Sequence, residues 1–219
     1  MDSEKKECIL TAAIANFTRF GFKKASVDEI AREAGVAKGT VYLAAESKED
    51  LFFQALHREV REWVAENAKL IDPRVSAEEL METLAWATLS QIEHKTLVWE
   101  LLAGEHNRLL PQWSDRLDDL RALCSRNTVE VLQLGIRQGR FQPGLDVESV
   151  ADLLLDLQIS TLLYYNRKRP DFGERLARRS KAAFGLILDG IRLTPAASAQ
   201  VAPLGAPDSR ASPLASLST

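Results

Sequence analysis

The residues best suited to a specific binding chemistry lie close together between Lys38 and Lys48. Lys38 can donate hydrogen bonds to guanine O6 and N7 or to a phosphate, and Thr40 can donate to a phosphate or contact a thymine methyl group. Tyr42 can hydrogen-bond a phosphate, and Gly39 permits a close approach of the backbone. Lys48 stands at the start of an expected helix, where backbone N–H groups favour an anion. These residue types in this order indicate a surface that contacts DNA.

The elements that must position these side chains are two short helices joined by a tight turn. Ala31 is small where two helices would cross closely, and Gly35, four residues later, supplies a left-handed turn conformation. Small residue, glycine and then an apolar residue is the pattern of a helix-turn-helix, whose second helix lies in the major groove of DNA. The apolar residues expected between the helices are Ile30, Ala34, Val36 and Val41.

At this level of detail, the stretch from Ile9 to Leu56 resembles the DNA-binding domain of the TetR family of bacterial repressors. The resemblance implies a homodimer whose C-terminal pocket binds a small molecule and thereby releases operator DNA. On these matches the expected DNA-binding residues are Ser26, Val27, Ala37, Lys38, Gly39, Thr40, Tyr42 and Lys48. The residues that carry the resemblance are Ala12-Ala13, Phe17, Gly21-Phe22, Ser26-Val27, Ile30-Ala31, Ala34-Gly35-Val36, Lys38-Gly39-Thr40-Val41-Tyr42 and Ser47-Lys48-Glu49-Asp50-Leu51.

Three alanines depart from the pattern of the family. Ala37 stands where a serine is frequent, and the loss of an N-cap hydroxyl costs about 1 kcal/mol of helix stability. Ala44 stands where the family often has Tyr or His, so a contact to phosphate or base is removed. Ala45 stands where the family often has Phe, so core volume is removed. These departures bear on the affinity for DNA and leave the fold assignment unchanged.

Composition sets the limits of this interpretation. The chain has 219 residues, of which 46% are hydrophobic and 27% charged, as in an ordinary globular protein. A disordered chain, a collagen and a disulfide scaffold are therefore excluded. The formal net charge of −3 excludes a strongly basic nucleic-acid coat but allows a small local DNA reader. Positive charge in the N-terminal part comes from Arg19, Lys23, Lys24, Arg32, Lys38 and Lys48.

Hydrophobic periodicity predicts about nine helices and no strand, and therefore an all-α fold. We expect a three-helix head with the helix-turn-helix in residues 1–47, and a larger helical effector-binding and dimerisation body in residues 48–193. The tail 194–219 is rich in Ala, Ser, Pro and Gly and is expected to be disordered.

The expected helix ends follow from individual residues. Gly21 is expected to end the first helix, and Ser26 and Ser76 each open a capping box with a glutamate three residues later. Ser47, Asp146 and Asp171 are expected to cap helices. Further segments predict a short helix over 38–44, a long one from Ser47 to about Leu70, an apolar one over 96–104, and an amphipathic one from Leu117 that ends at Gly139.

The body offers a candidate effector pocket and a candidate dimer interface. Aromatic and polar side chains of the second and third body segments could form the walls and anchors of a ligand pocket, although tryptophans in a core and exposed histidines would fit the sequence as well. The helices at about 147–167 and 171–191 carry the apolar faces expected of a dimer bundle. The candidate pocket residues are Trp86, Leu89, His94, Trp99, His106 and Trp113.

No cofactor or metal site is expected. Cys8 and Cys124 have no metal-ligand spacing and are expected to be buried or idle thiols in a reducing compartment. No apolar run is long enough for a membrane span, and the N-terminus is a poor signal peptide, so a cytoplasmic protein is expected.

The sequence therefore favours a ligand-responsive transcriptional regulator, not an enzyme, that binds a palindromic operator as a dimer and is released by a small-molecule effector. Two alternatives stay open. One is an all-helical small-molecule-binding protein or enzyme, for which the candidate groups are Glu93, His94, Glu100, Glu105 and His106. The other is an adaptor that uses its head to bind a protein.

Overall fold

The computed structural model describes residues 2–91, 97, 114–164 and 171–193. Over these residues the chain forms helices and no strand, which confirms the expected all-α fold, and one isolated antiparallel bridge joins Phe141 to Arg192. The expected segment 96–104, apart from Leu97, and the tail 194–219 lie outside the described residues. The helices are α1 (Ser3–Lys24), α2 (Val27–Glu33), α3 (Lys38–Ala44), α4 (Lys48–Ala68), α5 (Ala77–Gln91), α8 (Ser114–Arg137), α9 (Val147–Tyr164) and α10 (Phe172–Ile191).

Three of the expected N-caps are confirmed. Ser47 Oγ accepts a hydrogen bond from Asp50 N–H at 3.0 Å, and Ser76 Oγ accepts one from Glu79 N–H at 3.4 Å. Asp146 Oδ1 accepts one from Ser149 N–H at 3.1 Å. These side chains satisfy backbone donors that the first turns of α4, α5 and α9 leave without a helical partner.

Three expected helix ends are wrong in detail. Ser26 makes no side-chain cap to α2; its own N–H donates to Asn16 Oδ1 at 3.3 Å, which ties the start of α2 to α1 instead. Asp171 makes no cap to α10, and its carboxylate lies 3.6 Å from Arg175 Nη1, one turn further on. Gly21, with φ of 70°, breaks the regular helix as expected, but helical structure resumes and α1 extends to Lys24.

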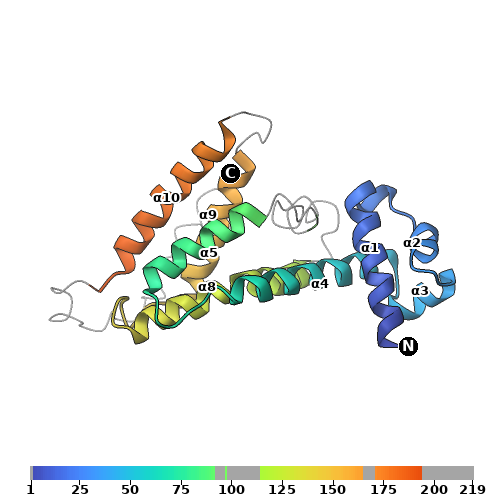
Figure 1. The fold of residues 1–219 in the computed structure, drawn as a ribbon, viewed down its shortest axis with the longest axis horizontal. Helices are drawn as coiled ribbons and strands as arrows, with labels where there is room; N and C mark the ends of the chain where they lie inside the picture. Colours follow the sequence, from blue (N-terminus) through green and yellow to red (C-terminus); the bar gives the residue numbers. More distant parts are fainter. Residues whose placement is uncertain (1, 92–96, 98–113, 165–170, 194–219) are drawn as a thin grey trace, which may run out of the picture.

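One hydrophobic core joins the head to the body. In the head, the rings of Phe17 and Phe52 meet edge to face with centroids 4.9 Å apart, and Phe22 packs against both. The same core continues along α4 to Leu117 and Leu120 of α8. Figure 1 shows α4 running from the head, formed by α1, α2 and α3, into the body, where α8 lies along it.

A second core fills the far part of the body, between α5, α8, α9 and α10. Phe141, in the turn after α8, is buried against Gly135 of that helix. Gln138 fixes the same region, because its Nε2 donates to Val75 O at 2.9 Å and its Oε1 accepts from Ala77 N–H at 3.0 Å. The start of α5 is thereby held on the end of α8.

Gly135→Ala is expected to destabilise the body. A Cβ atom at this position would overlap the ring of Phe141 and lie 2.9 Å from Ala77 Cβ, so buried groups would have to move. Overpacking of this kind costs about 1–3 kcal/mol of the free energy of unfolding. Urea denaturation measures the loss. Gly190→Ala is the matched control, because nothing lies within 4 Å of its added Cβ. Equal stability of the two variants would contradict the packing described here.

Candidate DNA-binding surface and head–body junction

The helix pair α2 and α3 has the geometry of a helix-turn-helix. Gly35 adopts the expected positive φ, 67°, and Val36 N–H donates back to Ala31 O at 2.9 Å. Ile30, Ala31 and Val41 are buried in the head core, with Ala31 at the crossing where its small size was expected. One side of the helix pair therefore packs on the head core, and the opposite side of α3 faces solvent.

The exposed face of α3 consists of Lys38, Gly39, Tyr42 and Leu43. The first three were expected there, and Tyr42 is 47% exposed. Leu43 was missed, although it is 78% exposed, one of the most exposed large apolar side chains among the described residues. An apolar side chain on such a face can contact a thymine methyl group. The signal that could have found Leu43 is its place next to Tyr42, on the side of α3 opposite Val41.

The other expected DNA contacts differ in how far they are accessible. Ala37 is exposed, and Thr40 and Ser26 are half-buried. Val27 is buried in the core, so its side chain positions α2. Lys48 Nζ donates to Lys23 O at 3.2 Å and lies 4.9 Å from the centre of the Phe22 ring, so it holds α4 against the end of α1.

Three basic side chains of the head pair with acids of α2. Lys38 Nζ lies 2.9 Å from Asp28 Oδ2, Arg32 lies 3.2 Å from Glu29, and Arg19 lies 3.8 Å from Glu33. The hydrogen bond from Lys38 to Asp28 raises the pKa of the lysine. Lys38 is therefore fully charged at neutral pH, but part of its charge is already matched by an acid on the same surface.

The three alanines that depart from the family pattern occupy distinct environments. Ala37 precedes α3 and supplies no side-chain cap. Ala44 is half-buried, and its carbonyl oxygen accepts a hydrogen bond from Gln54 Nε2 at 3.0 Å. Ala45 is buried in the head core, which also contains Phe17 and Phe52.

Comparisons with known proteins agree with this geometry. The model of the bacterial regulatory proteins of the tetR family matches residues 9–55. The transcriptional repressor KstR2 of Mycolicibacterium smegmatis is 27% identical over 192 residues, which are 86% of this chain and 91% of that repressor. Residues 9–55 therefore carry the DNA-binding domain of the tetR family, and most of the chain is similar to a transcriptional repressor.

Solved structures of TetR-family proteins share its fold. A regulator from Mesorhizobium loti superposes with a TM-score of 0.69 at 20% identity, over 88% of this chain and all of that one. FadR of Bacillus subtilis, solved in complex with stearoyl-CoA, superposes with a TM-score of 0.55 at 22% identity, over 84% of this chain and 98% of FadR.

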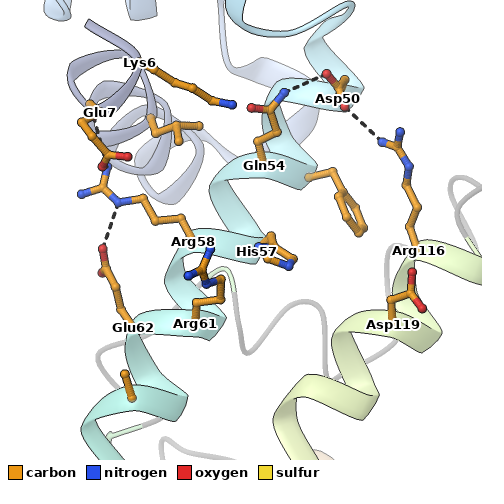
Figure 2. A pocket seen from close by; sticks show the side chains of 13 residues that line it. Lys6, Glu7, Asp50, Gln54, His57, Arg58, Arg61, Glu62, Arg116 and Asp119 are labelled. Carbon is orange, nitrogen blue, oxygen red and sulfur yellow. Dashed lines mark hydrogen bonds and ion pairs between the residues drawn. The ribbon is translucent and has the colours of Figure 1, made fainter. Parts of the chain in front are cut away.

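In this chain, the head meets the body around an open hollow of about 880 Å3 between α1, α4 and α8 (Figure 2). Asp50 is one of the acids that line it: Arg116 of α8 donates to Oδ1 at 3.1 Å, and Gln54 donates to Oδ2 at 2.9 Å. Burial alone would raise the pKa of Asp50, but hydrogen bonds from Gln54, Glu46 N–H and Arg116 outweigh it and lower the pKa. Asp50 is therefore ionised at neutral pH and links α4 to α8.

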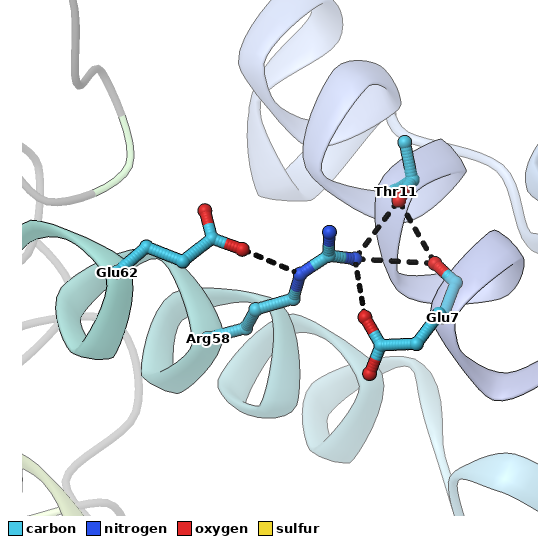
Figure 3. A network of polar contacts seen from close by, with 4 residues as sticks. All are labelled: Glu7, Thr11, Arg58 and Glu62. Carbon is cyan, nitrogen blue, oxygen red and sulfur yellow. Dashed lines mark hydrogen bonds and ion pairs between the residues drawn. The ribbon is translucent and has the colours of Figure 1, made fainter. Parts of the chain in front are cut away.

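Arg58 makes the corresponding link between α4 and α1 (Figure 3). Its Nη1 donates to Thr11 Oγ1 at 2.9 Å and to Glu7 O at 3.1 Å, and its Nε donates to Glu62 at 2.9 Å. His57 lies half-buried between the two links, and burial together with the charge of Arg61 lowers its pKa, so its ring is neutral at pH 7. Sequence reasoning missed all of these residues, because periodicity does not show which helices meet.

The expected effector residues are scattered or undescribed. Trp86 lies on α5 and is exposed beside a hollow of about 250 Å3 that α5 forms with α10. Leu89 is also on α5, but its side chain is not described, and His94, Trp99, His106 and Trp113 lie outside the described residues. Within the described ranges, no cluster of three or more His, Cys, Asp or Glu could hold a metal ion. No helix in those ranges is long and apolar enough to cross a membrane.

Asp28→Asn is expected to strengthen binding to DNA several-fold, because it removes a negative charge from the binding surface and releases Lys38 for phosphate. Lys38→Ala is expected to weaken binding to DNA and to make the affinity depend less steeply on salt concentration. Fluorescence anisotropy with operator DNA measures the affinities of both variants. Glu66→Gln is the control, since Glu66 pairs with Lys69 at the far end of α4. A loss of affinity in Asp28→Asn would show that Asp28 orients Lys38 instead of competing with DNA.

Proposed function

We propose that this chain is a ligand-responsive repressor that binds a palindromic operator as a homodimer and is released by a small-molecule effector. Residues 1–47 form the DNA-binding head in this proposal, and residues 48–193 form the effector-binding and dimerisation body. The observation that carries the proposal is the exposed face of α3 with Lys38, Tyr42 and Leu43. This face points outward because Val41, on the other side of α3, is buried in the head core.

The exposed face of α3 enters the major groove. Lys38 and Tyr42 bind phosphates or guanine, Leu43 contacts a thymine methyl group, and Gly39 allows the backbone to approach. Thr40 binds phosphate beside them, and Ala37 and Ser26 bring backbone close to the DNA. Lys48 adds positive charge at the start of α4, and Val27 acts by packing. Two heads related by a two-fold axis read half-sites about 34–36 Å apart, or a multiple of this spacing.

The dimer forms through α9 and α10. These helices pack against each other in the body (Figure 1). Leu153 of α9 and Leu186 of α10 are both exposed, and Leu186 is 78% exposed in the single chain. Large apolar side chains on two adjacent helices are typical of a surface that a second copy covers.

The effector binds in the body and is lipophilic. FadR, which shares this fold, was solved with stearoyl-CoA, and KstR2 of Mycobacterium tuberculosis, 25% identical, is described as a ketosteroid transcriptional regulator. These relatives make acyl-CoA thioesters and steroids the first candidates for this chain. A regulator that reads chromosomal DNA acts in the bacterial cytoplasm, and no catalytic step is proposed for it.

Selection of DNA from a random pool by the purified protein is expected to recover a palindrome. Anisotropy on that sequence is expected to show binding that weakens steeply with salt, because log K falls by about 0.9 per phosphate contact for each tenfold rise in salt. Lys38→Ala is expected to reduce this slope. Recovery of no sequence above background, with a folded dimer in hand, would overturn the proposal.

Leu186→Glu is expected to convert the dimer into monomers, because each interface would then bury uncompensated carboxylates. Analytical ultracentrifugation measures the mass, and operator anisotropy is expected to show weaker and less cooperative binding. Leu70→Glu is the control, since Leu70 is an exposed leucine in the turn after α4. A Leu186→Glu protein that remains dimeric would place the interface elsewhere.

A further inference from the structure

A small polar cavity lies in the middle of the body, enclosed by α4, α5, α8 and α9. Its volume is about 20 Å3, room for a single water-sized group. Trp63 of α4 and Leu155 of α9 form part of its apolar wall, and the amides of Asn67, Asn127 and Gln158 line it as well. Polar side chains are therefore concentrated at the point where the two hydrophobic cores of the molecule meet.

Two of these amide side chains are buried, and their oxygen atoms accept no hydrogen bond in the described structure. Asn67 is 3% exposed and Asn127 is 5% exposed, and the Oδ1 atom of each has no hydrogen-bond partner in the described structure. Asn127 Nδ2 donates to Val64 O at 2.8 Å, which orients its amide group and leaves Oδ1 for the cavity. Buried acceptors without partners destabilise a fold, so their presence calls for a donor that enters the cavity.

The cavity has no charge of its own. Every residue that lines it is neutral, and the Ser125 hydroxyl already donates to Asp152 Oδ1 at 3.1 Å. Burial raises the pKa of the Cys124 thiol to about 12, so this wall too stays uncharged at neutral pH. A carboxylate or phosphate placed here would face carbonyl oxygens without a counter-charge, which is strongly unfavourable.

We propose that this cavity is the specificity subsite of the effector, and that it takes one neutral hydrogen-bond-donating group, a hydroxyl or an amide N–H, between Asn67 and Asn127. The inference rests on the proposed function, since it assumes that an effector binds in the body. The ligand class that it names is a lipophilic molecule with a buried hydroxyl or amide, and any acidic group of that molecule lies outside this cavity.

The position of the subsite also connects it to the head. Asn127 is bonded to the backbone of α4 at Val64, and the same helix carries Asp50 and Arg58 at the head–body junction. A group that enters beside Asn127 therefore acts directly on the helix that orients α3. A ligand held in this cavity therefore lies between α8 and α4, where the rest of that ligand can shift α4 and change the spacing of the two heads in the dimer.

Matched pairs of alcohols and acids test the subsite on the full chain without DNA. The probes are 1-decanol against decanoate and benzyl alcohol against benzoate, at pH 7.5, with binding measured by tryptophan fluorescence and calorimetry. Each alcohol is expected to bind at least about tenfold more tightly than its acid, because a carboxylate would be buried unpaired. Equal affinities within both pairs, or no binding of either alcohol, would overturn the proposal.

Isosteric variants assign the preference to the two amides. Asn67→Leu and Asn127→Leu are each expected to weaken binding of the alcohols about tenfold and to leave binding of the acids unchanged. Gln133→Leu is the control, an exposed amide of α8 outside the cavity. An alcohol preference that persists in the double variant Asn67→Leu, Asn127→Leu would contradict the assignment.

Thermal unfolding separates a ligand site from a structural water site. If Asn67 is kept for a ligand, Asn67→Leu is expected to leave the Tm of the free protein unchanged or to raise it, because an unsatisfied acceptor is removed. A lower Tm together with no alcohol preference would show that the cavity holds a structural water only, and would overturn the proposal.

Operator binding by the same variants distinguishes a failure of the proposed repressor function from a failure of the proposed subsite. Compared with their own binding of operator DNA in the absence of probe, the Asn variants are expected to show no release by the alcohols. If no operator is found, the proposed function fails, whereas the ligand preference is still decided by calorimetry. If operator binding is normal but alcohols and acids bind alike, only the subsite fails.

Discussion

The structure depends on one helix, α4, which packs in both the head and the body. The 21 residues of α4 span about 31 Å, and this helix packs both on α1 of the head and on α8 of the body. The buried residues of α4 lie in one continuous core, which extends from Phe17 and Phe52 in the head to Leu117 and Leu120 in the body. The head is therefore packed directly on the body and is not joined to it only by a flexible linker. A displacement of α4 against α8 must be taken up by the packing of the head.

Polar links set how that displacement is transmitted. Arg58 fastens α4 to α1 through Thr11 and Glu7, so α1 moves with α4 as a unit. Arg116 reaches Asp50 from α8, and Asn127 reaches Val64 from the same helix. The first of these two links is at the partly exposed junction, where water competes for each charge, and the second is buried, where its loss would leave more polar groups unsatisfied. The buried link at Val64 is therefore the firmer attachment, and the junction at Asp50 is the more easily altered one.

Local features could be predicted from the sequence, and long-range contacts could not. The bounds of α3, the caps at Ser47 and Ser76 and the positive φ of Gly35 follow from patterns within a few residues, and the structure confirms them. Ser26 follows the same capping pattern, yet its N–H donates to Asn16, ten residues away, and no local pattern contains that contact. The ion pair of Lys38 with Asp28 and the amide bond of Asn127 to α4 depend on how helices meet, which periodicity leaves open. The solvent-facing side chain of Leu43 was missed because an apolar residue in a helix is usually assigned to the hydrophobic core.

Magnitudes decide what part of an effector could move this helix. To shift a two-state equilibrium from 1:99 to 99:1, a ligand must favour one state by about 5.5 kcal/mol. One or two neutral hydrogen bonds at Asn67 and Asn127 contribute about 1 kcal/mol each, so they select a ligand but do not supply the switch. The remaining free energy, about 3.5–4.5 kcal/mol, corresponds to about 140–180 Å2 of apolar surface removed from water in one state only, at about 25 cal/mol per Å2. The lipophilic part of the ligand therefore has to drive the shift of α4, while the polar cavity decides which lipophilic molecule binds.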